Sequence, residues 1–304
     1  MLSSREIVRN AWGLGKVIPA FNIPYLPMME PVVRAVVDTD SVALIEVARL
    51  EWMKFEAGSP RRVMEEYAKW VDPGHVRIHL DHVPVIDEDG NEVDYLNIMR
   101  EAIDLGYDSV MVDGSRLILD ENISATRKVA ELAHAAGIAC EAELGAVLGH
   151  AEGPLPPYEE LFESRRGFTD IAEAGRFVRE TECDWLSVAF GSIHGAISKA
   201  ARDRKKVEAR LNLSHLDQLR QAAQIPLVLH GGSGVRQEYV LAAVERGIAK
   251  INVGTEIRQA YEAALRETSS VTAAQQKTYD RTASLIRDYF CMAGTRAAVM
   301  GGAA

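Results

Sequence analysis

Cysteine is scarce in this chain of 304 residues, and its three cysteines form no CxxC pair. Cys140, Cys183 and Cys291 are odd in number and far apart, so we expect neither a disulfide framework nor a thiolate metal site. No apolar run approaches the roughly twenty residues that span a bilayer. The N-terminal MLSSREIVRN also lacks the apolar core of a signal peptide. We therefore expect a cytoplasmic protein with no membrane partner.

An excess of positive charge is also missing. The chain carries 34 lysine and arginine residues against 44 aspartate and glutamate residues, for a formal net charge of −10. Nucleic-acid binding needs cations against the phosphate backbone, so nucleic acid is not an expected partner. A local positive potential in a pocket could still bind an anionic metabolite. The apolar fraction of 47% is ordinary for a globular protein with a substantial core.

Short β-branched runs alternate with amphipathic segments along the chain. The expected strands are Val17–Asn22, Ser41–Val47, Val76–His82, Ser109–Asp113, Ile138–Leu144, Trp185–Ala189, Leu227–His230 and Ala249–Val253. The clearest helical patterns between them are Met28–Val37, Val93–Leu105, Glu121–Ala136, Ile171–Thr181 and Glu238–Arg246. Several helical segments end in a glycine just before the next strand, as at Gly106, Gly137 and Gly247. Eight strands separated by helices predict an α/β fold, a single (β/α)8 TIM barrel over residues 1–304.

Some connections are longer than plain βα turns. Residues 145–168 carry the proline-rich GPLPPY, and residues 191–212 carry the charged ARDRKKVEAR. Extended βα loops of this kind commonly act as lids or substrate-binding arms. After the last strand, the chain is expected to continue as a C-terminal helical extension and tail over about residues 270–304.

Polar residues stand at the ends of the expected strands, where a barrel of this kind carries its chemistry. They are, in chain order, Asn22, Glu46, Asp81, His82, Asp113, Glu143, His194, His230 and Asn252. Buried polar groups are costly unless they serve each other or a ligand, so this recurrence is difficult to assign to packing.

Three of these residues are histidines, whose ring nitrogens are common ligands of divalent metals. His82, His194 and His230 are therefore candidate ligands of one metal ion with an open position for substrate. The alternative is three separate, hydrogen-bonded histidines. Asp81 precedes the first of them and is a natural proton-transferring carboxylate beside the metal; alternatively, it holds a ligand histidine in place.

Two further carboxylates, Asp113 in VMVDGS and Glu143 in EAELG, are expected to support the ligands or to offer an alternative metal position. Direct catalysis by either is the less favoured interpretation.

Glycine-rich turns follow the last two strands. LVLHGGSG places Gly231, Gly232 and Ser233 between a strand and a helix, and KINVGTE does the same with residues 252–255. Free backbone N–H groups at a helix N-terminus bind phosphate, and these two loops form the usual phosphate site of barrels. The alternative is two ordinary glycine-rich turns.

Together, IHLDH, SVMVDGS, EAELG, GSIHG, IPLVLHGGSG and KINVGTE resemble, in order, the motifs of class II ketose-bisphosphate aldolases, the zinc-dependent fructose- and tagatose-bisphosphate group. The matches run from AFN at 20–22 to about residue 256. By this resemblance Asp81 is the catalytic proton carrier and His82, His194 and His230 bind zinc. The residues implied around the substrate and its phosphate are Asn22, Gly195, Gly231, Gly232, Ser233, Asn252, Gly254 and Thr255.

The resemblance implies an aldolase that cleaves or forms a carbon–carbon bond in a phosphorylated ketose. Zinc would stabilise the enediolate of dihydroxyacetone phosphate, or of a close analogue, as a Lewis acid. Some members of the family also imply a monovalent cation near the phosphate. The remaining partners expected are other copies of the same chain, in a homodimer or homotetramer.

The acceptor side departs from the family pattern. The loop glutamate that exchanges a proton at C3 has only Glu152 as its nearest counterpart, out of register in a longer loop. Gln-x-Ser after the second strand is replaced by Glu46-Val47-Ala48, and an aspartate is replaced by Gly254. We therefore expect fructose 1,6-bisphosphate to be a poor substrate. Two alternatives stay open: a metal-dependent sugar-phosphate epimerase or isomerase, and a non-catalytic sugar-phosphate-binding barrel.

Overall fold

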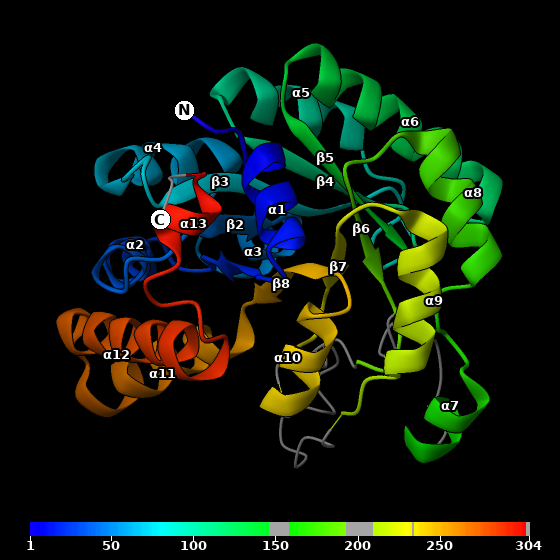
Figure 1. Cartoon of the computed structure of the whole chain (residues 1–304). Helices are drawn as coiled ribbons and strands as arrows, with labels where there is room; N and C mark the ends of the chain where they lie inside the picture. The colour runs from blue at the N-terminus through cyan, green and yellow to red at the C-terminus, as the bar shows by residue number, and fades with distance from the viewer. Residues whose placement is uncertain (146–157, 193–208, 233, 302–304) are drawn as a thin grey trace.

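Eight parallel strands form a closed barrel in the computed structural model, which describes residues 1–145, 158–192, 209–232 and 234–301. Figure 1 shows the strands at the centre, with helices around them. The strands are β1 Ile18–Asn22, β2 Ala43–Ala48, β3 Val76–Pro84, β4 Ser109–Asp113, β5 Ala139–Leu144, β6 Trp185–Val188, β7 Leu227–Leu229 and β8 Ile248–Val253. They pair in chain order, and β8 closes the barrel against β1.

The predicted strands are confirmed to within about two residues at each end. Every residue of β1, β2 and β5 is buried, as expected when a parallel sheet is covered on both faces. β7 ends at Leu229, so His230 lies just beyond its strand. β3 is the longest of the eight and continues past the predicted end to Pro84.

The helices cover the outside of the barrel. Their bounds are α1 Ser4–Gly13, η1 Leu26–Met28, α2 Met29–Asp38, α3 Arg49–Lys54, α4 Pro60–Trp70, α5 Tyr95–Leu105, α6 Leu119–Ala135, α7 Tyr158–Ser164, α8 Ile171–Thr181, α9 Leu213–Ala223, α10 Gln237–Val244, α11 Thr255–Thr268, α12 Val271–Ser284, η3 Leu285–Tyr289 and α13 Arg296–Val299. Gly106 ends α5 in a left-handed conformation, with φ of 90°, as predicted from its position. No helix in the described ranges is long and apolar enough to cross a membrane.

The C-terminal extension is helical, as predicted, and packs on the barrel. α12 continues into the π-helical turn η3 and lies against α2. The last helix, α13, contacts the N-terminal helix, where Asn10 Nδ2 donates to the Val299 carbonyl at 2.9 Å. It also contacts the turn after α2, where Arg296 pairs with Asp40 at 2.7 Å. The chain therefore ends, within the described residues, on the same side as it begins (Figure 1).

The barrel interior holds charge as well as apolar side chains. Glu46, His79, Glu141 and Lys250 lie on four different strands and are completely buried. In the parallel register, Glu46 is the partner of His79 on the neighbouring strand. Polar groups at such positions need partners, and these four have them in one another.

Candidate active site

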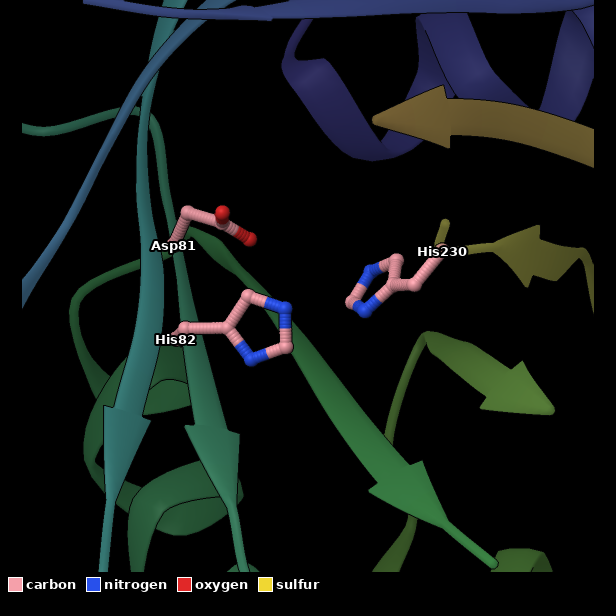
Figure 2. Close-up of side chains that lie close together, drawn as sticks. All are labelled: Asp81, His82 and His230. Atoms are coloured by element: carbon pink, nitrogen blue, oxygen red, sulfur yellow. The ribbon is translucent and has the colours of Figure 1, made fainter. Parts of the chain in front are cut away.

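An irregularity in β3 brings two successive side chains to the same side of the strand. Neighbouring residues of a regular strand point to opposite faces, but the register with β4 shifts between Leu80 and Val83. His82 lies within this shift, in the left-handed region at φ of 34°, which is strained for a residue with a side chain. As a result, Asp81 and His82 both point toward His230 across the barrel mouth (Figure 2).

Asp81, His82 and His230 form a compact group. Each offers one ligand atom, and these three atoms lie within 4.8 Å of one another. The rings of His82 and His230 are 4.5 Å apart between centroids. The structure thus brings together two of the three predicted histidine ligands and the predicted proton carrier.

Asp113 and Glu143 also join this group. His82 Nδ1 lies 3.3 Å from Asp113 Oδ2 and 3.6 Å from Glu143 Oε2, and His230 Nδ1 lies 3.3 Å from the same Glu143 oxygen. His82, Asp113 and Glu143 form a second set whose ligand atoms lie within 4.8 Å of one another. Asp113 and Glu143 therefore lie close to the histidines, as predicted. Their roles as supporting or alternative metal ligands stay predictions.

This donor set suits a divalent cation. Lone pairs of imidazole nitrogens and carboxylate oxygens face one another at close range, and only a proton or a metal ion between them makes the arrangement favourable. Burial disfavours charge on His82, yet the neighbouring Asp81 and Asp113 raise its pKa well above the usual value. The same carboxylates would hold a metal cation.

Asp81 is fixed by two asparagine side chains. Asn22 Nδ2 donates to its Oδ2 at 3.1 Å, and Asn252 Nδ2 donates to its Oδ1 at 2.9 Å. Burial alone would raise the pKa of Asp81, but the charges of His82 and Lys250 lower it below the usual range. Asp81 is therefore held as an oriented carboxylate that can accept a proton.

A cavity of about 240 Å³ opens above this group. Five of the predicted substrate and phosphate residues line it: Asn22, Gly231, Asn252, Gly254 and Thr255. Gly254 is the N-cap of α11, so the cavity reaches the N-terminus of a fourteen-residue helix, where backbone N–H groups and the helix dipole favour an anion. Gly232 lies against a smaller neighbouring hollow instead.

Four of the predicted site residues fall outside the described residues. They are Glu152, His194, Gly195 and Ser233. Their predicted roles as loop proton carrier, third metal ligand and phosphate-binding residues are thus left as predictions.

Glu46 lies beside a cation. The sequence places this carboxylate near the expected metal, where it would oppose a second phosphate of the substrate unless a cation offset its charge. In the structure it lies two residues before the end of β2, completely buried, with Oε2 at 3.2 Å from Lys250 Nζ. Burial, followed by the nearby Asp81, raises the pKa of Glu46 well above the usual value. Glu46 is not among the residues that line the described cavity, and Lys250 lies beside its carboxylate.

Sequence reasoning missed Glu51, a cavity residue on the short helix α3. Its Oε2 accepts hydrogen bonds from the Ala48 backbone N–H at 2.8 Å and from Asn22 Nδ2 at 3.5 Å. Burial, and to a lesser degree Asp81, raises the pKa of Glu51 to about 8. The signal was a glutamate three residues into a helix that starts directly after a strand, which on its own indicates only a helix cap.

Comparison with known proteins identifies the family. The family model of class-II fructose-bisphosphate aldolases matches residues 2–298. The chain belongs to this family. Its members are carbon–carbon lyases that generally depend on a divalent metal, so the family, the TIM-barrel fold and the enzyme class predicted from the sequence are all confirmed.

Individual relatives agree with this assignment. A 6-phospho-5-dehydro-2-deoxy-D-gluconate aldolase of Bacillus velezensis is 37% identical over 199 residues, which are 66% of this chain and 59% of that protein. A fructose-bisphosphate aldolase of Streptococcus pneumoniae is 31% identical over 287 residues, covering 92% of this chain and 88% of the relative. The crystal structure of the YdjI aldolase from Escherichia coli K12 superposes with a TM-score of 0.77 at 26% identity, over 97% of this chain and all of that one. These relatives are aldolases, so they give no support to the epimerase alternative.

Proposed function

We propose that this aldolase cleaves a ketose phosphate into dihydroxyacetone phosphate and an aldehyde that carries no phosphate. The release of dihydroxyacetone phosphate is supported by the cavity itself, which combines a proton-accepting carboxylate, a metal-binding group and a helix N-terminus. The absence of a phosphate on the aldehyde is supported by the acceptor side of the cavity, described below.

His82, His194 and His230 would hold the metal, with Asp113 and Glu143 as supporting or alternative ligands. A divalent metal bound there would draw electrons from the ketose carbonyl and stabilise the negative charge that develops on its oxygen. We propose zinc as this metal, because imidazole ligands with one open position suit it. A monovalent cation near the phosphate is a further part of the proposal.

Asp81 would take the proton from the hydroxyl next to the breaking bond. Its hydrogen bonds from Asn22 and Asn252 hold the carboxylate in one orientation, so the accepting oxygen needs no reorganisation. In the condensation direction, the same group returns the proton to the new hydroxyl. Glu152 is proposed as the separate carrier for the carbon-bound proton of dihydroxyacetone phosphate.

The phosphate of the substrate would bind at the N-terminus of α11. Gly254 and Thr255 begin this helix, and Gly231, which turns the chain at a φ of 68°, lies across the same cavity. Glycine at these positions lets the backbone approach an anion closely. Ser233, Gly195 and Gly232 complete the proposed phosphate-binding set.

The acceptor side combines apolar side chains with cations that already have partners. Leu50, Phe55 and Ile86 line it. Arg258 makes two contacts of 2.9 Å with the carboxylate of Glu262, and its guanidinium lies over the Phe55 ring. A second phosphate would have to compete for such cations, and competition lowers its affinity.

Another cation of this wall is also paired. Arg49 Nη1 lies 3.8 Å from Asp87 Oδ2, in the connection between β3 and α5. Uncharged hydroxyaldehydes therefore suit this side better than phosphorylated ones. An aldehyde with a carboxylate is the second candidate, because the Bacillus velezensis relative is named for a gluconate derivative.

The test is hydrogen exchange on dihydroxyacetone phosphate alone. We expect the metal-loaded enzyme to exchange one hydrogen of the hydroxymethyl carbon with deuterium oxide, followed by proton NMR, because no aldehyde is needed for this half-reaction. Condensation is then measured with glyceraldehyde, glyceraldehyde 3-phosphate and a carboxylate-bearing aldehyde. If the enzyme loaded with zinc, cobalt or manganese exchanged no hydrogen, dihydroxyacetone phosphate would be ruled out as the product of cleavage.

Removing one metal-binding histidine gives a second test. We expect His230→Ala to lower zinc affinity by more than about a hundredfold and to abolish aldol cleavage, because direct ligands matter at least as much as their hydrogen-bond partners. The barrel should still fold, since β7 is anchored by the buried Leu227–Leu229. Metal analysis after gel filtration measures the content, and unchanged zinc in the folded variant would refute the assignment.

Cytoplasmic location and a homodimeric or homotetrameric state belong to this proposal as well. Cys140 and Cys183 are both buried and free, which fits a reducing compartment. Light scattering of the purified protein tests the oligomeric state.

A further inference from the structure

Lys250 on β8 is a buried lysine that the mechanism above does not use. Its side chain is completely buried in the barrel, and its Nζ contacts three oxygens: Asn252 Oδ1 at 2.5 Å, Glu141 Oε2 at 3.0 Å and Glu46 Oε2 at 3.2 Å. Asn252 Oδ1 accepts a hydrogen bond from this ammonium group, and the two glutamate oxygens are its ion-pair partners. Lys250 is not among the residues that line the described cavity, which argues against direct contact with substrate.

The contact with Asn252 decides which way that amide faces. Lysine can only donate, so the amide oxygen must face Lys250 and the NH2 group must point away. The NH2 group then donates to Asp81 Oδ1 at 2.9 Å. If the amide turned over, its oxygen would face the Asp81 carboxylate and repel it. Lys250 therefore fixes the donor that orients the proton carrier.

The contact with Glu141 acts in the same way on the metal group. Glu141 uses Oε2 for Lys250, while its Oε1 faces His230 Nε2 at 3.0 Å. A carboxylate can only accept, so a neutral His230 ring that donates to Glu141 carries its hydrogen on Nε2 and keeps the lone pair of Nδ1. Nδ1 is the nitrogen on the side of Glu143, and the hydrogen bond from the opposite nitrogen selects this tautomer for metal binding.

We propose that Lys250 is a positioning residue that orients the proton carrier through Asn252 and the metal-binding His230 through Glu141. One side chain thereby sets the geometry of both halves of the reaction from beneath the cavity. The inference rests on the proposed function for its kinetic readout, but metal affinity tests it independently. The competing explanation is a buried ion pair that serves the fold alone, which a well-packed apolar side chain could replace.

The primary variant is Lys250→Met, which keeps most of the length of the side chain and removes all three N–H donors. We expect zinc affinity, measured by competition with a chromogenic chelator, to fall by about ten- to a hundredfold. The kcat for aldol cleavage should fall about a hundredfold, because cleavage needs the oriented Asp81, while the KM for the ketose phosphate changes less than about threefold. A folded variant with unchanged zinc affinity and kcat, and only a lower melting temperature, would overturn the proposal.

A matched pair of variants tests whether Lys250 acts on His230 through Glu141, even if Lys250→Met does not fold. Glu141 and Glu46 both contact the lysine, but in the described structure Glu141 also contacts His230. We expect Glu141→Gln to lower zinc affinity about tenfold or more, and Glu46→Gln to change it by less than about threefold. Equal effects of the two substitutions would show that charge near Lys250 matters and its orientation of His230 does not.

The zinc measurements also separate this inference from the proposed function. If the wild-type enzyme fails to exchange hydrogen on dihydroxyacetone phosphate while the zinc affinities follow the expected pattern, the proposed reaction is wrong and the positioning by Lys250 stands. If exchange proceeds but the two glutamine variants are indistinguishable in zinc affinity, the reaction stands and the positioning is wrong.

Discussion

Replacement of Asp81 by alanine should lower kcat for aldol cleavage by about a thousandfold, within the range that positioned acid–base groups contribute. The KM for the ketose phosphate should change by less than about threefold, because the proton moves only in the transition state. Steady-state assays of dihydroxyacetone phosphate release give both constants.

The same variant should retain hydrogen exchange on dihydroxyacetone phosphate to within about tenfold, because this half-reaction involves no proton at the hydroxyl that Asp81 serves. Its zinc content should stay near that of the wild type. Asp113→Asn is the matched control: it removes a second carboxylate charge from the same group while its side-chain oxygen can still accept from Ser115. If cleavage and exchange fell together in Asp81→Ala, the aspartate would act on the metal group rather than as the proton carrier.

The fold could be predicted because local signals agreed along the whole chain. Apolar runs of strand length alternate with helical periodicity, and glycines such as Gly106 and Gly137 stand where helices end. Those signals depend on neighbours in sequence, so they survive without knowledge of tertiary contacts. Boundaries shifted where tertiary contacts decided them, as at the end of β3.

The candidate site was predicted in its residue types more than in its geometry. Strand-end logic selected Asp81, His82 and His230, which the structure brings together, but a regular strand would have turned Asp81 and His82 to opposite faces. The bulge between Leu80 and Val83 depends on the pairing with β4. No residue type in IHLDH predicts it.

The buried charge network escaped sequence reasoning for a different reason. Lys250, Glu141 and His79 stand inside strands, where polar residues normally face solvent in an open sheet. In a closed barrel, alternate residues of every strand face an interior, and charges on several strands can neutralise one another there. A charged residue at an inward position of several strands is the signal that would have found them.

The acceptor side is where the structure changes the argument about specificity. The expected weakness of fructose 1,6-bisphosphate does not rest on the charge of Glu46, which is buried beside Lys250. It draws instead on Ala48 and Gly254, which line the cavity without a hydrogen-bonding side chain. A Cβ atom at Gly254 would lie 3.2 Å from Asn22 Oδ1, so the family's aspartate would press on a residue that orients Asp81.

Fructose 1,6-bisphosphate should therefore be cleaved with a kcat/KM roughly a hundred- to a thousandfold below ~10⁵ M⁻¹s⁻¹, an ordinary enzymatic value. Each lost hydrogen-bond partner of an acceptor hydroxyl costs about 1–3 kcal/mol, and two such losses account for a decrease of this size. Fructose 1-phosphate carries the same hydroxyls, so only the phosphate at C6 discriminates between the two substrates. The carboxylates that pair with Arg49 and Arg258 disfavour the phosphate at C6, so they lower kcat/KM for the bisphosphate further. Asp87→Asn, which releases Arg49, should raise kcat/KM for the bisphosphate several-fold and leave the monophosphate unchanged. Coupled assays of dihydroxyacetone phosphate release measure all four values, and a wild-type kcat/KM for the bisphosphate near ~10⁵ M⁻¹s⁻¹, an ordinary enzymatic value, would contradict this account of the acceptor pocket.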